Sequence, residues 1–523
     1  MAKGYRRVDR DQPFLFPPDM REWLPKSHVV WLVIEAVRRL DTQAFHARRK
    51  TGGKGAAGYD PDMMVTLLIW AYANGVTSSR RIERLCQQDV AFRVICAGQL
   101  PDHVTIARFR QQFAGTAAAL FAQVLLLCAR LGMGQVGTVA LDGTKIAASA
   151  SKDANRAGEA LRKLAAGLAA AHAEADAAED ALFGEGKRGD DDPGDPFTRG
   201  ERVAAALASL EEERLAREAE ERAKAEGHLQ AARAGAPVQG RPPAGAEVEL
   251  ARRSLEREEG TARARWQEYQ AGPRRGRQPA RPEESAKVKK AGARLEKALA
   301  AQAKREAARQ AAAAAGSEPK RNVTDPASRL MPVRGGGFTQ GYNAQNVTSQ
   351  DGLVIATRLT QDTTDTPWYE PMISQAAAAA AAMAAAGGPG GEIGLVLADA
   401  GYLSGDNLTC PGPDRLIATG KHRDLEKAAR ASGESGEGTG EGVIAAMAAR
   451  LATRDGIAAY RRRSHIGETF HGDLKHNQHF RRLSVRGLPR ASGEWTFAAA
   501  VRNLRKAITS GHLTRQALAA LPG

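Results

Sequence analysis

The sequence predicts an α/β core that follows an all-α region and is interrupted by a long helical insertion. Three observations support this class. Short apolar runs of the kind found in buried strands end at small-residue turns in two distant parts of the chain, helical periodicity dominates the stretch before the first run, and residues 153–320 turn abruptly to Ala, Glu, Arg and Lys. The 523 residues exceed one ordinary core and suggest about three units at ~150 residues each.

Residues 1–130 are expected to form a helical N-terminal domain. Capped helices are predicted at residues 77–83 and 101–110, and the second carries Arg108 and Arg110, which we expect to be exposed. The early residues of such a second helix are those that a helix-turn-helix protein places in the major groove, so this domain is expected to bind DNA. Helix pairs with arginines are also common in proteins that bind no DNA, so a purely structural role for the pair stays open.

The first core strand is expected within residues 131–152, and the insertion follows it. An apolar run over residues 139–141 is closed by Asp142, where a turn is expected. In residues 153–320, large apolar side chains are too few to offset the entropy cost of a packed domain, so we expect an extended antiparallel helical arm or partly mobile helices. Basic clusters at residues 274–277 and 287–290 are either contacts to DNA or a partner, or a solvated face.

Residues 321–510 are expected to complete the core. Residues 341–348 and 353–357 flank a turn and predict a hairpin, and further strands are predicted at residues 393–398 and 415–418, with helices between and after them. This order of strands and helices, with the insertion placed after the first strand, is that of a ribonuclease-H-like catalytic core.

A helix is expected from Thr366 to about residue 386. Pro367 suits its first turn, and Asp365 just before it is interpreted as a cap rather than as a metal ligand. The last residues, 511–523, are predicted to form a C-terminal tail.

Three acidic residues are candidate catalytic residues and metal ligands. Asp142 and Asp399 each close a predicted buried strand, and Glu468 lies in a basic, amphipathic stretch. Phosphoryl transfer needs hard oxygen ligands that hold two divalent ions ~4 Å apart, and carboxylates suit Mg²⁺. An aspartate at a strand end before a small residue is also a common turn former or helix cap, so each aspartate taken singly keeps that alternative.

The stretch around Glu468 resembles a motif of bacterial insertion-sequence DDE transposases. It contains Tyr460, Arg463, Glu468 and Lys475 in the order of that family's Tyr-Arg-Glu-Lys motif, with the arginine one position further from the glutamate than in the commonest form. Shorter stretches also resemble the family and occur in its order, at residues 58–61, 141–146, 322–329 with 341–345, and 399–402.

The resemblance implies a DDE transposase that cuts DNA at its element's ends and joins the freed 3′-hydroxyls to target DNA. Asp142, Asp399 and Glu468 would bind two Mg²⁺ ions, for which Mn²⁺ can substitute. Lys475 would contact the end DNA, and Arg463 and Tyr460 would support the site and the DNA. The implied partners are double-stranded DNA, as terminal inverted repeats and target, and further copies of the chain, as a homodimer or larger assembly.

Two other functions stay open, a ribonuclease-H-like nuclease that only cuts and an inactive, transposase-derived regulator that binds specific DNA. The net charge of +15 and the pI of about 9.8 suit a nucleic-acid partner and salt-dependent binding. The four cysteines lack metal-site spacing and fit a reducing cytoplasm, so a cytoplasmic, nucleoid-associated protein is expected. We expect no membrane span, because no apolar stretch of about 18 residues with large side chains is evident.

Overall fold

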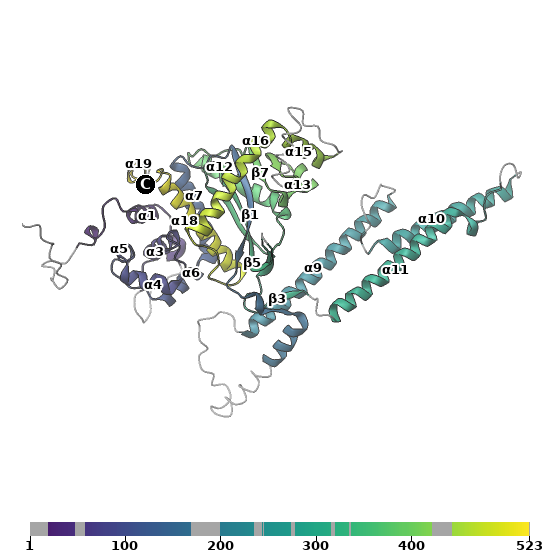
Figure 1. Cartoon of the computed structure of the whole chain (residues 1–523), viewed down its shortest axis with the longest axis horizontal. Coiled ribbons are helices and arrows are strands. Elements are labelled where there is room, and N and C mark those ends of the chain that lie inside the picture. Colours follow the sequence, from purple (N-terminus) through teal and green to yellow (C-terminus); the bar gives the residue numbers. More distant parts are fainter. Residues whose placement is uncertain are drawn as a thin grey trace, which may run out of the picture. The chain divides into compact units, whose positions relative to one another are not determined.

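The computed structural model describes residues 19–47, 58–168, 199–234, 243, 245–272, 278–314, 319–333, 336–420 and 442–521. The chain divides into two compact units, one made of Met1–Lys152 and Ala327–Gly523 and the other of Asp153–Pro326. Figure 1 shows the elements of both units. The basic cluster predicted at residues 274–277 lies outside the described residues.

The described part of the N-terminal region is helical, as the sequence predicts. Ser78 and Asp102 cap the two predicted helices, since their side chains accept hydrogen bonds from backbone N–H groups of the first turns. A further short helix lies between these two in the chain, so they are not consecutive. The elements are η1 Met20–Glu22, α1 Val29–Arg38, α2 Gln43–His46, α3 Pro61–Ala73, α4 Ser79–Gln88, α5 Val90–Ile95, α6 His103–Gln111 and α7 Phe113–Arg130.

A mixed β-sheet forms the centre of the first unit. Its order is β4-β5-β1-β7-β8, and β6 pairs with β5 as the predicted hairpin. Strand β5 runs antiparallel to β1, β4 and β6, whereas β7 runs parallel to β1 and β8 runs parallel to β7. The strands are β1 Thr138–Ala147, β4 Arg329–Pro332, β5 Phe338–Ser349, β6 Val354–Thr360, β7 Leu395–Ala398 and β8 Asp414–Ile417.

Strand β1 corrects the prediction that the first strand ends at Asp142. The strand continues to Ala147, and Gly143 stands opposite Gln345 of β5 instead of forming a turn. The reason is the long antiparallel partner, because β5 offers backbone hydrogen bonds to β1 well beyond the point where β7 stops. Asp142 therefore lies in the middle of a strand.

The N-terminal helices and the sheet share one hydrophobic core, which includes Leu68 and Val139. Helix α18 (Leu488–Thr509) packs against both α7 and β6. Its crossing with α7 is close, since a Cβ added to Gly493 would lie 2.5 Å from the carbonyl carbon of Phe113, and the rings of Phe113 and Phe497 stack at 4.1 Å. The predicted domain boundary at residue 130 falls inside this unit.

Helix α7 also corrects the expectation about apolar stretches. Its 18 residues are long and apolar enough to cross a membrane by length and composition alone. More than half of the helix is buried inside the unit, where it packs against α18, as the core helix of a folded domain does.

Helices fill most of the remaining first unit. The predicted helix after Asp365 is present as η4 and α12. The predicted C-terminal tail contains α19, which Thr514 caps and which buries Leu518. These elements are η4 Thr366–Trp368, α12 Tyr369–Ala385, η5 Ala400–Tyr402, α13 Gly405–Thr409, α15 Val443–Leu451, α16 Arg454–Arg463, η6 Ser464–Glu468, α17 Thr469–Gly472, η7 Asp473–Asn477 and α19 Arg515–Ala520, with η6 and η7 being π-helical.

The second unit is built mainly of long helices with few buried side chains. Strands β2 and β3 pair antiparallel, and a small core gathers Leu161, Val203 and Ala206. Helices α10 and α11 lie side by side and antiparallel, and Arg305 pairs with Glu247 at 2.7 Å between them (Figure 1). The elements are β2 Asn155–Ala157, α9 Arg199–Arg233, α10 Glu247–Ala271, η3 Pro282–Glu284, α11 Ala286–Ala314 and β3 Lys320–Asn322, with η2 Lys152–Ala154 at the boundary.

Candidate active site

The parallel pairing of β1 and β7 brings Asp142 and Asp399 to adjacent positions. Leu141 pairs with Ala398, so the two aspartates are the next residues of neighbouring strands, which run about 4.8 Å apart. The Asp142 side chain is only 14% exposed. Two residues far apart in the chain therefore present carboxylates at one place on the sheet.

Asp399 also acts as a helix cap. Its Oδ1 accepts a hydrogen bond of 2.9 Å from Gly401 N, at the start of η5. Asp399 can therefore cap η5 and still offer a carboxylate oxygen beside Asp142, because the cap occupies only one of its two oxygens.

Asp365 is an acidic residue of this site whose role the sequence did not predict. It was expected to cap the following helix, but its side chain makes no capping hydrogen bond to η4. Its Oδ1 instead accepts hydrogen bonds from Asn343 Nδ2 at 2.6 Å and Gln345 Nε2 at 2.7 Å, and lies 3.5 Å from Lys145 Nζ. Buried amides in a strand require partners, so alternating Asn343 and Gln345 were the signal that could have found it.

The second oxygen of Asp365 faces the same glycine as Asp399. A Cβ added to Gly401 would lie 3.0 Å from Asp399 Oδ1 and 3.1 Å from Asp365 Oδ2. The two carboxylates therefore flank one Cα, and a larger residue than glycine would crowd both. Thr366 holds this approach in place, since its hydroxyl donates a 2.8 Å hydrogen bond to the Gly401 carbonyl.

Arg463 connects Glu468 to Asp142. Its two terminal nitrogens lie 3.6 Å from Asp142 Oδ1 and 3.3 Å from Glu468 Oε1. The Arg463 side chain is 16% exposed and the Glu468 side chain is 54% exposed, so the glutamate closes the site from the solvent side. Gly467 lies against Asp142, since a Cβ added to it would be in ordinary van der Waals contact with Asp142 Cβ at 3.5 Å.

The extra residue between Arg463 and Glu468 is absorbed by a π-helical turn. In a regular α-helix one added residue rotates everything after it by about 100°. Residues Ser464–Glu468 form a π-helical stretch instead, whose wider turn accommodates one residue more. As a result Arg463 hydrogen-bonds Glu468 five positions later. The departure from the commonest spacing therefore leaves both side chains together.

Lys475 and Tyr460 lie beside these acids. Lys475 Nζ donates hydrogen bonds to Thr144 Oγ1 at 2.5 Å and to the Lys145 carbonyl at 3.1 Å, both on β1. Tyr460 is buried, and the Arg463 guanidinium lies 6.0 Å from its ring centre. Both residues thus contact groups next to Asp142 or Glu468.

His471 faces Asp142 across a gap too long for a hydrogen bond. Its Nε2 lies 3.5 Å from Asp142 Oδ2, and within the described residues neither ring nitrogen has a hydrogen-bond partner. Burial, together with the neighbouring cations Lys475 and Arg463, lowers the His471 pKa to about 3, so the imidazole is neutral.

Burial and clustered negative charge make Asp142 a weak acid. Burial is the largest cause that raises its pKa to about 7, and the charges of Asp399 and Glu468 raise it further against the opposing effect of Arg463. Burial likewise raises the pKa of Asp399 and lowers that of Lys475. Asp142 is therefore partly protonated near neutral pH, and a cation bound beside it would favour its charged form.

The donor set fits divalent cations that prefer oxygen ligands. Carboxylate oxygens are the ligands of Mg²⁺ and Mn²⁺, and negative charge attracts a cation. The acids are not gathered within 4.8 Å of one another, because Arg463 stands between Asp142 and Glu468. In the described part of the chain such a tight group occurs only at His46, Asp60 and Asp62, which are exposed.

The two arginines predicted to contact DNA differ in burial. Arg108 is exposed on α6. Arg110, expected to be exposed, is 5% exposed, donates a 2.6 Å hydrogen bond to Ser484 Oγ and lies over the Tyr72 ring. The prediction for Arg110 is wrong because its face of α6 packs against the core rather than against solvent.

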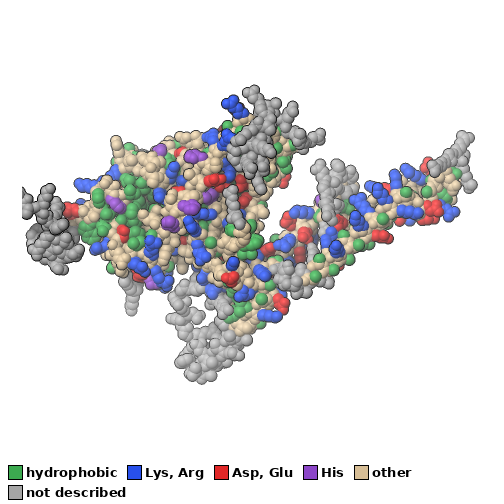
Figure 2. Space-filling view, in the orientation of Figure 1, with side chains coloured by type: hydrophobic (Ala, Val, Ile, Leu, Met, Phe, Trp, Pro, Cys, Tyr) green, Lys and Arg blue, Asp and Glu red, His purple; other side chains and the backbone are tan. Residues whose placement is uncertain are grey.

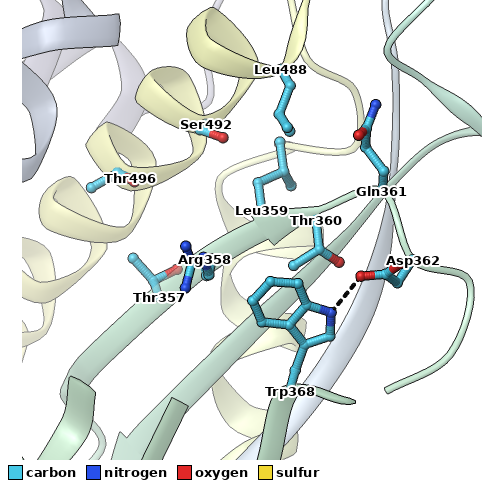
Figure 3. Close-up of a pocket in the computed structure, with 10 residues that line it drawn as sticks. All are labelled: Thr357, Arg358, Leu359, Thr360, Gln361, Asp362, Trp368, Leu488, Ser492 and Thr496. Carbon is cyan, nitrogen blue, oxygen red and sulfur yellow. Dashed lines mark hydrogen bonds between the residues drawn. The ribbon is translucent and has the colours of Figure 1, made fainter. Parts of the chain in front are cut away.

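A separate pocket of about 510 Å³ lies between β6, η4 and α18 (Figure 3). Trp368 Nε1 donates a 2.8 Å hydrogen bond to Asp362 on its wall, and Arg358 lies over the Trp368 ring at 4.9 Å. Asp142, Asp365, Asp399 and Glu468 are absent from its lining, so this pocket is distinct from the acidic site.

Comparison with known families finds two matches in different parts of the chain. Residues 18–112 match a family described as "Transposase domain (DUF772)", and residues 439–508 match one described as "Transposase DDE domain". No curated protein and no solved structure matches significantly. The two matches support a DDE-type transposase, a family that implies DNA binding, and the second implies a ribonuclease-H-like core.

Proposed function

We propose that this protein is a transposase that uses Mg²⁺ to cut DNA at the ends of its element and to transfer the freed 3′-hydroxyls into target DNA. One observation carries the proposal. Parallel strands put Asp142 and Asp399 side by side, and Arg463 links Asp142 to Glu468. The transposase matches at both ends of the chain support the same class of enzyme.

The sheet supports a ribonuclease-H-like layout of the core. Three antiparallel strands, β6, β5 and β1, are followed by β7 and β8, which continue parallel to β1. In open α/β sheets, sites lie beside the carboxyl ends of parallel strands, which is where Asp399 follows β7.

Asp142, Asp399 and Glu468 would hold two divalent ions. When bound, such ions polarise a phosphate, activate the attacking oxygen and stabilise the leaving one. Arg463 neutralises part of the negative charge of Asp142 and Glu468. To admit a cation, Arg463 would have to release one of these two carboxylates, so we assign it the role of holding them close together before the metal binds. Mn²⁺ is expected to substitute for Mg²⁺, since both take oxygen ligands.

The basic residues of the site would act on DNA. Lys475 lies next to Asp142 by way of Thr144 and can offer its ammonium group to a phosphate oxygen. Tyr460 supports Arg463 through its ring. These roles follow the Tyr-Arg-Glu-Lys type of transposase, in which the lysine contacts the end DNA and the arginine and tyrosine support the site. Arg108 is the remaining candidate for a DNA contact on the N-terminal helices. Joining two DNA ends requires at least a dimer during the reaction.

The test is a cleavage and joining assay with the DNA that flanks the gene. Wild type is compared with Asp142→Asn, Asp399→Asn and Glu468→Gln, and Asp406→Asn serves as a matched control on an exposed acid of the same region. Wild type and the control should nick the ends and join them to a target plasmid in Mg²⁺, whereas the three variants should bind DNA and do neither.

The outcome separates the alternatives. Cutting without joined product would identify a nuclease, and specific binding without any metal-dependent nicking would identify a regulator. Equal cutting by all variants would overturn the assignment of the acids.

A further inference from the structure

Helix α11 carries a row of cations along one side. Lys287, Lys290, Arg294, Lys297 and Lys304 follow one another at intervals of three and four residues, except that Ala301 fills one place between the last two. Residues at this spacing share one side of an α-helix. All five are exposed. Figure 2 shows the Lys and Arg side chains that line the helices of this unit.

The row lies beside the packing side of α11, not on it. Val288, Ala291, Leu295 and Ala298 are buried or half-buried and recur at the same three and four spacing, one position away from the row. The apolar side of α11 is thus used against α10, and the cationic side is left to solvent within this unit.

In the described part of this unit, the cations of the row lack the acidic partners that most cations of the neighbouring helices have. Within the described residues none of the five forms an ion pair, and only Arg305 of α11 does so, with Glu247. On α9 and α10 most basic side chains pair with glutamates, usually one helical turn away. Such pairs involve Arg214, Arg217, Lys224, Arg233, Arg252, Arg253, Arg257 and Arg263.

This contrast distinguishes the row from an ordinary solvated helix. Alternating charges at four-residue spacing stabilise a solvent-exposed helix by themselves, as on α9 and α10. A row of like charges at the same spacing repels itself and destabilises the helix slightly. Glu296 and Glu306, the described acids of α11, stand off the row. Because no acidic side chain among the described residues of this unit neutralises the row, its charge favours binding of an anionic partner.

We propose that this row binds the phosphate backbone of duplex DNA without regard to sequence. From Lys287 to Lys304 the helix rises about 26 Å, which is most of one turn of a DNA duplex at ~34–36 Å. Lysine and arginine heads without interleaved polar side chains can contact phosphates but cannot distinguish bases. An amphipathic membrane helix would need a free apolar face, which α11 uses against α10. The inference rests on the proposed function only for naming DNA as the anion.

The test is a binding titration of the full chain without divalent metal, so that cleavage plays no part. One variant replaces Lys287, Lys290, Arg294, Lys297 and Lys304 with Gln. The matched control replaces the same number of paired cations, Arg214, Arg217, Lys224, Arg253 and Arg263, with Gln and removes the same charge. A third variant changes the four lysines of the row to Arg. The probe is a fluorescein-labelled duplex of arbitrary sequence, measured by anisotropy at several salt concentrations.

The row variant should bind at least about tenfold more weakly at low salt, with a salt slope shallower by about 0.9 for each phosphate that the row no longer neutralises. The control and the Arg variant should match wild type. The proposal is overturned if the row variant binds as tightly as wild type, or if the row variant and the control are weakened equally. Neither result would bear on metal-dependent cleavage by wild type. Absence of DNA binding by wild type itself would instead overturn the proposed function.

Discussion

Replacing Asp142 with Asn should stabilise the metal-free protein while abolishing cleavage. Burial raises the Asp142 pKa to about 7 from the ordinary value of 3.8, so the folded state binds this proton more tightly than the unfolded state. Stability then falls as pH rises from about 4 to 7, because the unfolded carboxyl ionises first. Three pH units at ~1.36 kcal/mol each give about 4 kcal/mol of destabilisation above pH 7.5, which the neutral amide avoids.

Thermal melts of wild type and Asp142→Asn at several pH values measure this difference. The gap in unfolding free energy should widen by roughly 2 kcal/mol between pH 5.5 and 8.5, and the Asp406→Asn control should show no gap. Added Mg²⁺ should raise the Tm of wild type and leave that of Asp142→Asn nearly unchanged, because only the native carboxylate site binds it. A constant gap across pH, or a less stable Asp142→Asn, would refute the buried-charge explanation.

Four other substitutions probe residues around the acids and on the N-terminal helices. Asp365→Asn should lower Mg²⁺-dependent cleavage by about tenfold or more, as removal of a group that supports metal ligands commonly does, and an unchanged initial rate at limiting Mg²⁺ would contradict this. Arg110→Met should lower the free energy of unfolding by about 2 kcal/mol because it removes a buried hydrogen bond. Arg108→Gln should leave the Tm unchanged and weaken DNA binding. The reverse pattern would refute a structural role for Arg110 and a DNA contact for Arg108. Lys475→Met should make the salt slope of end-DNA binding shallower by about 0.9, and an unaltered slope would exclude a phosphate contact.

The strands were predictable because their buried positions are filled by short runs of apolar side chains. The apolar runs before Asp142 and Asp399 predicted buried strands, and both strands are present. The extent of β1 was not predictable from its own residues, since Asp142 and Gly143 favour a turn until β5 supplies backbone partners. Strand ends depend on what pairs with them, which a local pattern does not contain.

The side-chain contacts of the site depended even more on tertiary structure. Asp365 stands where a helix cap is expected, but its Oδ1 accepts hydrogen bonds from the distant amides Asn343 and Gln345, and its Oδ2 lies near Gly401 beside Asp399. Arg110 follows Arg108 by two positions on a short helix, a rotation of about 200°, so one points to solvent and the other to the core. The π-helical turn before Glu468 was likewise not predicted. Its one trace in the sequence is the extra residue between Arg463 and Glu468.

Electron paramagnetic resonance of bound manganese can establish whether the acids share a pair of ions, since Mn²⁺ replaces Mg²⁺ and reports on its neighbours. Wild type bound to end DNA should hold two Mn²⁺ ions that are magnetically coupled, because such a pair lies ~4 Å apart. Asp142→Asn and Asp399→Asn should each abolish the coupled signal. An unchanged spectrum in either variant would contradict a two-ion site built on these acids.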